Sequence, residues 1–326
     1  MNMKKIFALL LVLVMSISLA ACGGQAEEPT EPVTDPVTTE PQAESLDRVV
    51  VFNSSLCTVL EAFGKADAIV GAYGTLAESY GVPSCGKWNE VDVEAVIATG
   101  ATAVFAYEKY TTEEQINKLN QAGIACCFIE LSDANAAAEE IAQLGELFGC
   151  QEKAQIFVEL YNTYDALLKE KLATVEPLTV YVEGTAKEPF KTANATTAAH
   201  ALVEGAGLVN IYADNETAYP ERNLEAVITA DPDVIVKICG SSETPADSYA
   251  EYAAGLFGVA AADEGKVILL NNQVGTTAIG SIIGRLYVAK FAYPDLLADV
   301  DVDAVYQQLC ESFLGTACTG SGAYAG

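Results

Sequence analysis

The chain has 326 residues, of which 51% are hydrophobic, and its 17 Lys and Arg stand against 45 Asp and Glu, for a formal net charge of −28. So acidic a chain argues against nucleic-acid binding, which needs a basic face, and against docking on anionic lipid through a basic patch. The globular part, roughly 280 residues, is long for one small core and suits two lobes.

The N-terminus has the pattern of an export signal. Lys4 and Lys5 precede an unbroken apolar run that is too short and too one-sidedly flanked for a membrane span. The run ends in Leu19-Ala20-Ala21-Cys22, which resembles a bacterial lipobox. We therefore expect residues 1–21 to be a lipoprotein signal peptide, with the lipid anchor on the sulfur of Cys22. The alternative is an ordinary secretion signal with a chance cysteine.

Residues 22–46 are expected to form a disordered tether. From residue 25 the segment consists almost wholly of Pro, Thr, Glu, Asp, Gln and Ala, without an aromatic residue. Such a composition cannot bury enough apolar area to offset the entropy of ordering. An extended segment of this kind would hold a domain away from a membrane.

Residues 47–150 alternate between strand and helix patterns and predict a first lobe. The expected strands are 48–52, 67–74, 102–107 and 124–131, and the expected helices are 56–64, 91–100 and 111–123. The last of these helices begins with Thr111 as its cap, has Glu113 in its first turn and ends at Gly123. Short loops between alternating strands and helices predict a parallel sheet covered by helices.

Residues 151–173 predict one long helix between two lobes. At 1.5 Å per residue, a helix of about 20 residues spans roughly 30 Å, which is more than one small lobe needs. It would act as a rigid strut and allow only small closure of the lobes. A helix over 136–149 precedes it.

Residues 174–326 resume the alternation and predict a second lobe that ends in a short flexible tail. Strand-like segments are 178–184, 208–213, 233–238 and 266–272, and helix-like segments are 196–207, 223–230, 248–258, 278–293 and 302–315. The expected fold class is therefore α/β: two lobes with mostly parallel sheets flanked by helices, joined by one long inter-lobe helix.

Several stretches carry a family resemblance over residues 48–315. They are "RVVVFNSSLCTVLEAFGKADAIVGAYG", "NLEAVITADPDVIV", "KVILLNN" and "GRLYVAKFAYPD". They resemble the substrate-binding lipoproteins of the ferric-siderophore, haem and cobalamin ABC importers, the class of binding proteins with a helical backbone. The first-lobe stretch "VDVEAVIATGATAVF" departs from the family pattern, which tends to have Lys-Pro-Asp before the strand, but it keeps the glutamate.

The word EAVI occurs once in each half of the chain, with Glu94 and Glu225 in the same phase. In the family, one surface Glu of each lobe docks into arginine pockets of the two permease subunits, and these are the positions that match. A plainer explanation also exists. Asp92 and Asn223 look like N-caps, and an acid in the first turn of a helix is favoured by the dipole by about 0.3–1 kcal/mol.

In such a fold, loops at the carboxyl ends of the strands should hold the ligand between the lobes. By position, the candidate ligand-binding residues are Asn53, Ser54, Tyr73, Lys87, Trp88, Tyr107, Lys191, Tyr219, Arg222 and Asn272. Trp88, the only tryptophan, lies in a loop beside a lysine and suits a flat or bulky ligand. The alternatives are that Trp88 anchors its own loop and that Arg222 pairs with a nearby acid.

The expected function is that of an extracytoplasmic, lipid-anchored binding protein that captures an iron complex, either a ferric siderophore or haem, and delivers it to an ABC permease dimer. A corrinoid such as cobalamin is the alternative ligand, and an enzyme or a surface adhesin on the same scaffold is the alternative of another class. We expect no catalytic residues, no cofactor, no nucleic-acid partner and a monomer.

The histidine and the cysteines remain to be interpreted. One histidine, His200, is too few for a site that binds free zinc or manganese, so no metal site is expected. His200 could pack, cap or ligate haem. Among the cysteines, Cys310 and Cys318 are the nearest pair by spacing for a disulfide of an exported protein.

Overall fold

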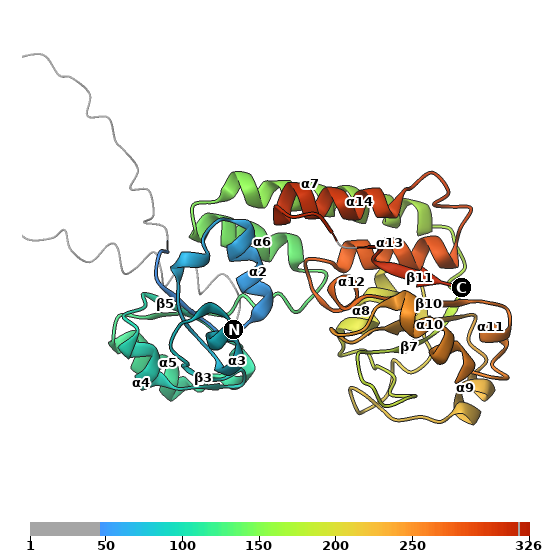
Figure 1. Cartoon of the computed structure of the whole chain (residues 1–326), viewed down its shortest axis with the longest axis horizontal. Helices are drawn as coiled ribbons and strands as arrows, with labels where there is room; N and C mark the ends of the chain where they lie inside the picture. Colours follow the sequence, from blue (N-terminus) through green and yellow to red (C-terminus); the bar gives the residue numbers. More distant parts are fainter. Residues whose placement is uncertain (1–45, 319) are drawn as a thin grey trace, which may run out of the picture. The chain divides into compact units, whose positions relative to one another are not determined.

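The computed structural model describes residues 46–318 and 320–326. The expected signal peptide, Cys22 and the tether up to residue 45 lie outside the described residues. Within the described part, two sheets each carry their own helices, and helical segments run from one to the other (Figure 1). The fold is the α/β class that the alternating pattern predicted, with mostly parallel sheets in two lobes.

The first lobe contains a four-stranded parallel sheet with the order β2-β1-β5-β6. Its strands are β1 (Val49–Val51), β2 (Ile69–Ala72), β5 (Ala103–Phe105) and β6 (Ala125–Cys127). Val49 and Val51 belong to one apolar cluster and Val50 to another, so both faces of β1 are buried. Burial on both faces explains why this segment is an unbroken apolar run.

The helices of the first lobe are α2 (Ser54–Ala62), α3 (Gly74–Tyr80), α4 (Val93–Ala98), α5 (Glu113–Gln121) and α6 (Ala137–Leu147), with 3₁₀ segments η1 (Ala66–Ala68) and η2 (Glu108–Tyr110). Three of these helices, α2, α4 and α5, begin after a residue whose side chain caps them. Thr112, not Thr111 as expected, caps α5, because it forms a reciprocal capping box with Gln115.

Three features of this lobe differ from the expected pattern. Helix α3 was not expected, nor was the hairpin of β3 (Gly86–Lys87) and β4 (Glu90–Val91). Strand β6 ends at Cys127 rather than at residue 131. It ends early because the Glu140 carboxylate accepts the backbone N–H of Glu130 and of Leu131, at 3.3 and 3.1 Å, in place of a neighbouring strand.

The second lobe contains a five-stranded sheet with the order β11-β10-β9-β7-β8. Its strands are β7 (Thr179–Glu183), β8 (Val209–Asn210), β9 (Val234–Ile238), β10 (Val267–Leu270) and β11 (Ala323–Ala325). Its helices are α8 (Ala198–Gly205), α9 (Leu224–Ala230), α10 (Pro245–Ala254), α11 (Ala260–Asp263), α12 (Asn272–Thr276), α13 (Ser281–Ala292) and α14 (Val302–Leu309). All neighbouring strands are parallel except β10 and β11.

The C-terminal end is held in place, which corrects the expectation of a flexible tail. Strand β11 pairs antiparallel with β10. A disulfide joins Cys310 to Cys318, whose Cα atoms are 5.6 Å apart. The backbone N–H of Gly322 donates to the Tyr287 hydroxyl at 3.1 Å. The sequence hid the strand because "AYA" is too short to show an alternating pattern.

Two helical segments link the lobes, where the sequence predicted one. Helix α7 (Gln151–Leu172) packs against α6 and α13. The π-helical segment η3 (Cys310–Leu314), which continues α14, packs against both α7 and α2. Its Phe313 ring lies 5.2 Å from the ring of Phe157 and 6.2 Å from that of Phe63, between centroids. The C-terminal helix therefore reaches back to the first lobe.

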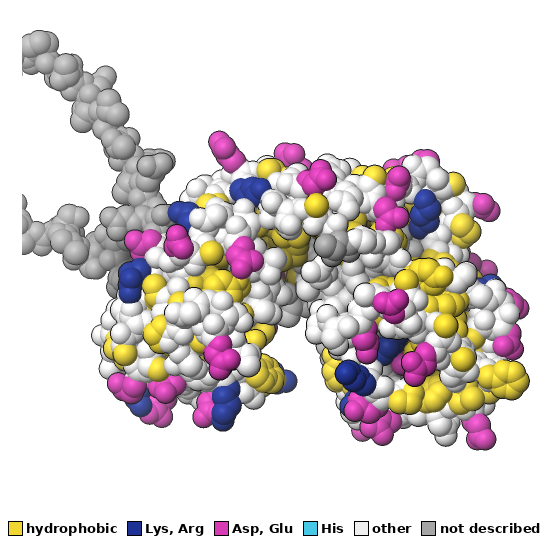
Figure 2. Space-filling model, viewed as in Figure 1, with side chains coloured by type: hydrophobic (Ala, Val, Ile, Leu, Met, Phe, Trp, Pro, Cys, Tyr) yellow, Lys and Arg dark blue, Asp and Glu magenta, His cyan; other side chains and the backbone are white. Residues whose placement is uncertain are grey.

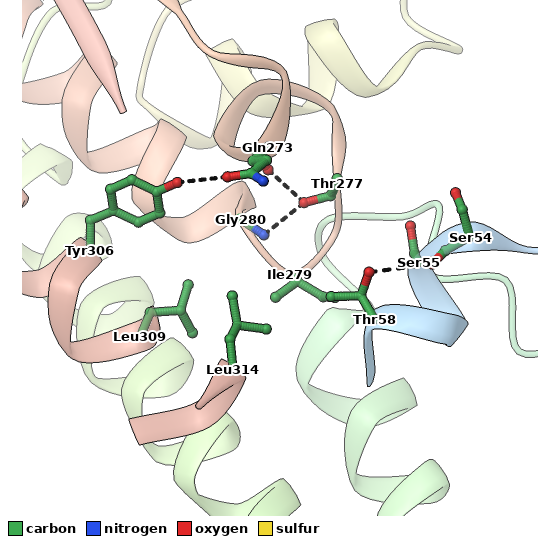
Figure 3. Close-up of a pocket in the computed structure, with 10 residues that line it drawn as sticks. All are labelled: Ser54, Ser55, Thr58, Gln273, Thr277, Ile279, Gly280, Tyr306, Leu309 and Leu314. Carbon is green, nitrogen blue, oxygen red and sulfur yellow. Dashed lines mark hydrogen bonds between the residues drawn. The ribbon is translucent and has the colours of Figure 1, made fainter. Parts of the chain in front are cut away.

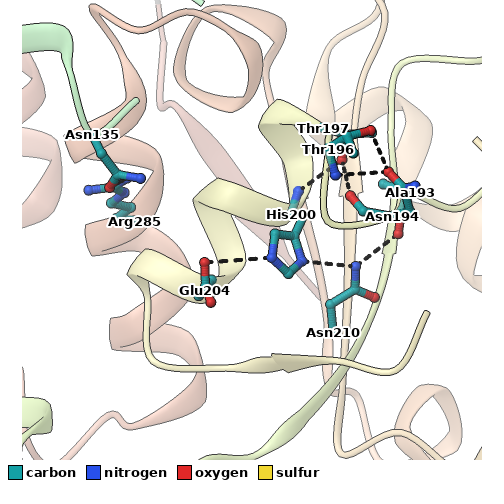
Figure 4. Close-up of polar contacts among 9 residues, drawn as sticks. All are labelled: Asn135, Ala193, Asn194, Thr196, Thr197, His200, Glu204, Asn210 and Arg285. Carbon is teal, nitrogen blue, oxygen red and sulfur yellow. Dashed lines mark hydrogen bonds and ion pairs between the residues drawn. The ribbon is translucent and has the colours of Figure 1, made fainter. Parts of the chain in front are cut away.

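One buried arginine joins the lobes and the long helix. Arg285 of α13 is 2% exposed. Its Nη2 donates to Asn135 Oδ1 at 2.7 Å (Figure 4), and its Nη1 donates to the Tyr161 hydroxyl at 3.1 Å and lies 3.7 Å from Asp165 Oδ1. Because a Cβ at Gly205 would overlap the arginine side chain, the close packing of α8 on α13 requires glycine there.

We predict that Arg285→Met lowers the free energy of unfolding by about 3–5 kcal/mol, because it leaves buried polar partners without their cation. Lys169→Met is the matched control, since Lys169 pairs with the same Asp165 at 2.6 Å but is 76% exposed. Its loss should cost less than about 1 kcal/mol. Denaturant unfolding of both variants measures the difference, and equal losses would contradict the role given to Arg285.

Of the six free cysteines that the structure describes, three are buried and three are half-buried. Burial raises the pKa of Cys57 and Cys127 to about 12. It also raises the pKa of Cys85, Cys126 and Cys239 to about 11. The thiolate is the reactive form, so these side chains should react slowly while the protein is folded.

Thiol titration of a soluble form that lacks residues 1–22, and so keeps eight of the nine cysteines, tests this arrangement. At pH 8 we expect slow modification of the folded protein. Unfolding without a reductant should reveal six thiols, and unfolding with a reductant all eight, because one pair is disulfide-bonded. Eight thiols without a reductant would show that the disulfide is absent.

Candidate functional site

The topology of each sheet directs attention to one edge. In an open α/β sheet, ligands bind outside the carboxyl ends of the strands where the strand order reverses. The reversal falls between β1 and β5 in the first sheet and between β7 and β9 in the second. Residues that directly follow these strands are therefore the best placed to meet a ligand.

A cavity of about 150 Å³ lies where the lobes meet (Figure 3). It is lined by Ser54, Ser55 and Thr58 of α2, by Gln273, Thr277, Ile279 and Gly280 around α12, and by Tyr306, Leu309 and Leu314. Helices α2 and α12 follow the carboxyl ends of β1 and β10. Ligand sites for small molecules measure roughly 300–1,000 Å³, so this cavity is smaller than a typical ligand site, and we call it the floor.

The polar groups of the floor are neutral hydroxyls and amides held by short local bonds. The Tyr306 hydroxyl donates to Gln273 Oε1 at 3.0 Å. The Thr277 hydroxyl donates to the Gln273 carbonyl at 2.5 Å and accepts the Gly280 N–H at 3.0 Å. No charged side chain lines the cavity. The floor is therefore lined by uncharged groups, and the polar groups named here are already bonded to one another.

Three aromatic rings form what we call the aromatic cluster: Trp88, Tyr107 and Tyr110. The Trp88 ring lies edge-on to Tyr110 at 5.1 Å and to Tyr107 at 6.3 Å, between centroids, and the two tyrosine rings are 6.3 Å apart. Tyr107 follows β5 at the reversal point, and burial raises the pKa of its hydroxyl, which stays protonated at neutral pH. Trp88 is 50% exposed and presents a free surface.

The β3–β4 hairpin sets the position of Trp88. Gly86 has a φ of +123°, and a Cβ there would overlap the Glu90 carbonyl, so the hairpin requires glycine at that position. Lys87 forms an ion pair with Glu90 at 2.8 Å across the same hairpin. Both residues are largely exposed, so this pair contributes little stability. The ion pair does, however, occupy Lys87, the lysine next to Trp88.

The second lobe contributes an aromatic residue and a cation that already has partners. Tyr219 is 49% exposed and lies near Gly184, which follows β7, because a Cβ at that glycine would be 3.7 Å from the tyrosine ring. The Arg222 guanidinium lies 4.7 Å from the centre of the Tyr212 ring and donates to Asn215 Oδ1 at 2.5 Å. These contacts fix the guanidinium within its own lobe.

A buried charged pair anchors the loop that follows β7. Glu183 is 1% exposed, and burial raises the pKa of its carboxyl. The carboxylate accepts the Tyr181 hydroxyl at 2.8 Å and the Phe190 N–H at 3.1 Å. Lys237, 3.7 Å from this carboxylate, donates to the carbonyls of Gly184 and Ala186, each at 2.8 Å. Both ends of the loop are therefore bonded to the Glu183–Lys237 pair. These bonds also satisfy the buried charges, which would otherwise be costly.

Four of the predicted ligand residues differ in what they offer. Asn53 is 5% exposed, caps α2 and donates to the Glu130 carbonyl, so its side chain is already engaged. Ser54 lines the cavity, whereas Asn272 is next to the lining residue Gln273. Tyr73 stacks on Phe52 at 6.5 Å, between centroids.

Lys191 and Arg222 are neighbours through the backbone. The backbone of Lys191 forms an antiparallel β-bridge with that of Glu221, the residue before Arg222. Of the predicted residues, Ser54 lines the floor, Trp88 and Tyr107 belong to the aromatic cluster, and Lys191 and Arg222 are neighbours in the second lobe. The sequence analysis missed Tyr110, Thr58 and Gln273. For Tyr110 the signal was its place three residues after Tyr107.

His200, the only histidine, has a structural environment (Figure 4). Its Nε2 lies 3.5 Å from Glu204 Oε2 on the same helix, and its Nδ1 lies 3.4 Å from Asn210 Nδ2. Asn210 also donates to the Ala193 carbonyl at 2.8 Å. The histidine thus links α8 to β8. Residues 46–318 and 320–326 contain no cluster of three or more His, Cys, Asp or Glu side chains suited to a metal ion.

Glu94 and Glu225 occupy the same place on α4 and α9. Each is exposed and lies in the first turn of its helix. The side chain of the N-cap, Asp92 or Asn223, accepts the backbone N–H three residues later, at 3.1 and 2.9 Å. Neither carboxylate forms an ion pair within the described part of the chain. Both are free to meet a partner.

Two lobes of parallel sheet whose strand ends share a cavity define a two-lobed binding-protein fold. The family model of periplasmic binding proteins matches residues 49–274, and the chain belongs to that family. Membership indicates a location outside the cytoplasm. None of the described helices is both apolar enough and long enough to cross a membrane.

Known proteins resemble the chain in sequence and in fold. A cobalamin-binding protein of Halobacterium salinarum is 29% identical over 257 residues, which cover 71% of this chain and 68% of that protein. The TroA-like periplasmic binding protein FepB of Veillonella parvula has a TM-score of 0.73 at 18% identity, covering 86% of this chain and 95% of that one. The periplasmic vitamin B12 binding protein BtuF of Vibrio cholerae has a TM-score of 0.58 at 17% identity, with coverage of 76% and 96%.

Proposed function

We propose that this protein binds a corrinoid of the cobalamin type between its lobes and delivers it to an ABC importer. The observations that carry the proposal are the aromatic cluster at the strand reversal of the first lobe and a floor lined by uncharged side chains. A corrinoid is a large flat macrocycle edged with neutral amides. Rings that pack on its face and hydroxyls and amides that bond to its edge are the complementary groups.

The charges near the site support a neutral ligand over an anionic one. Many ferric siderophore complexes carry negative charge and need free cations. Here Lys87 is paired with Glu90 at 2.8 Å, and Arg222 is bonded to Asn215 at 2.5 Å. Lys109 lies over the Tyr110 ring, 5.4 Å from its centre, and Lys191 forms no ion pair within the described residues. The chain as a whole has a net charge of −28, which would repel an anion. The 29% identity to a cobalamin-binding protein agrees with the same choice.

An iron complex, the first expectation from the sequence, is the competing ligand. Haem held through a histidine would need His200, whose two ring nitrogens face Asn210 and Glu204. A tyrosine of the aromatic cluster is the other possible axial ligand. The test below therefore includes haem and ferric siderophores beside the corrinoid.

The proposed delivery uses the two exposed acids. Glu94 and Glu225 would each meet an arginine pocket on one subunit of a permease dimer, while lipidated Cys22 would keep the protein at the membrane. We further propose that it acts as a monomer and is not an enzyme, since the one histidine serves a structural contact. An adhesin, by contrast, would need no enclosed site and would show no thermal shift with small molecules.

The ligand is tested by titrating the soluble protein with cyanocobalamin, haem and several ferric siderophores. Because Trp88 is the only tryptophan, its fluorescence reports on the aromatic cluster. Cyanocobalamin should quench this fluorescence and raise the melting temperature. Trp88→Ala should weaken binding, measured by calorimetry, by about 10- to 100-fold, the effect of losing about 1.4–2.8 kcal/mol of stacking.

Tyr324→Ala is the control, since Tyr324 is also exposed (42%) but lies on β11. It should leave affinity unchanged. Binding of haem or a ferric siderophore without binding of cyanocobalamin would move the ligand to the iron complexes. A lack of response to every compound would contradict the proposed function.

Docking is tested by replacing both acids. Glu94→Ala with Glu225→Ala should leave ligand affinity unchanged and abolish cellular uptake, because charge pairs at the rim of an interface set specificity and on-rate. Glu78→Ala with Glu251→Ala replaces exposed acids of α3 and α10 and should leave uptake intact. Unchanged uptake in the first double variant would rule out the docking role.

A further inference from the structure

The second lobe exposes a large apolar side chain beside its docking acid. Phe257 is 80% exposed, more than any other large hydrophobic residue in the described part of the chain, where the next is Val209 at 52%. It lies in the loop between α10 and α11. A Cβ at the neighbouring Gly258 would lie 3.7 Å from Ile228 Cδ1, so the loop adjoins α9, the helix of Glu225.

The loop holds Phe257 outward rather than leaving it free. Leu256 and Val259, on either side, are 2% and 0% exposed and belong to the core of the lobe. The Val259 N–H donates to the Leu256 carbonyl at 3.0 Å, which closes a tight turn around the phenylalanine. An anchored turn with an exposed aromatic at its tip is suited to a protein interface, because little entropy is lost when it binds.

The same helical face carries a second apolar residue. Ile228, 41% exposed, follows Glu225 by three residues, so both side chains lie on one face of α9. In the first lobe Ile97, 36% exposed, follows Glu94 by the same spacing on α4. Each lobe thus presents an acid beside an isoleucine, and the second lobe adds Phe257.

The first lobe has a different neighbour at this position. Lys118 of α5 is close enough to Glu94 for the acid to raise the pKa of its ammonium group, after the larger effect of Glu114, with which it forms an ion pair at 2.8 Å. The two docking helices are therefore alike, but one has a cation beside it and the other an exposed aromatic ring. The surfaces of the two lobes are unequal.

We infer that Phe257 and Ile228 form an apolar anchor that binds the permease subunit facing the second lobe, in a pocket next to the cation that meets Glu225. The inference rests on the proposed delivery to an ABC importer. Exposed apolar side chains bordered by acids fit a partner with an apolar pocket and a basic rim. Figure 2 shows hydrophobic side chains gathered over the α9–α11 edge with acidic side chains around them. The acids, Glu225 and Asp263 among them, disfavour an anionic membrane surface as the partner.

Photo-crosslinking identifies what covers the anchor. p-Benzoylphenylalanine is placed at position 257 of the full-length, membrane-anchored protein in its own cells, and adducts are identified by mass spectrometry. We expect an adduct with an integral-membrane subunit of an ABC importer. The same probe at position 209, on the exposed edge strand β8, should give none. An adduct only with a second copy of the chain, an adduct only with lipid, or no adduct would overturn the inference.

A functional variant separates this inference from the identity of the ligand. Phe257→Ser should lower cellular uptake of the ligand at least tenfold without changing ligand affinity or melting temperature, while Val209→Ser should change none of these. If titration shows that no corrinoid binds but position 257 still forms the permease adduct, the anchor stands and the ligand assignment fails. Full uptake by Phe257→Ser would overturn the anchor alone.

Discussion

The buried guanidinium of Arg285 is the interaction on which the arrangement of this molecule depends. Arg285 lies on α13, in the second lobe. It donates hydrogen bonds to Tyr161 of α7 and to Asn135, which precedes α6. A cation with 2% exposure is stable only if its partners stay in place. Separation of these three elements would leave the charge without its partners, so the middle of the long helix is tied to α13 and to the segment before α6.

That constraint bears directly on the cavity. The cavity is lined by residues of α2, of the α12–α13 segment and of the C-terminal helix. It therefore exists only while the lobes keep their spacing. Segment η3 adds a second link, with Phe313 packed between Phe63 and Phe157. With two links and a shared buried charge, the structure favours a site that is largely formed before the ligand arrives.

Much of the fold could be predicted because strong local signals agree with the tertiary structure. The apolar run of β1 and the helix of residues 151–172 each have a pattern that packing reinforces, whereas the cap of α5 lies one residue later than predicted. The hairpin that places Trp88 and the strand β11 could not be predicted, because each strand has only two or three residues. They form through pairing with residues that the sequence does not show to be near.

The site was predicted less well than the fold, for a related reason. Position after a strand marks a residue as near the site, but it does not say whether a side chain is free. Asn53 follows β1 as expected, yet it is engaged in capping α2. Tyr110 was missed although it packs on Trp88 at 5.1 Å, between centroids. The network of Glu183 and Lys237 joins residues 54 positions apart, and no local pattern announces such a pair.

The order of the strands is the same in the two sheets, which indicates a common origin. The spatial order of the strands in the first sheet is β2-β1-β5-β6. In the second sheet, taken from its other edge and without β11, the order is β8-β7-β9-β10. Both are the order second, first, third, fourth, and in both the EAVI helix comes directly before the third strand. Duplication of one ancestral four-stranded unit produces this pattern. Each repeat carries one acid in its EAVI helix, so docking through Glu94 and Glu225, as proposed above, would suit a partner made of two like subunits.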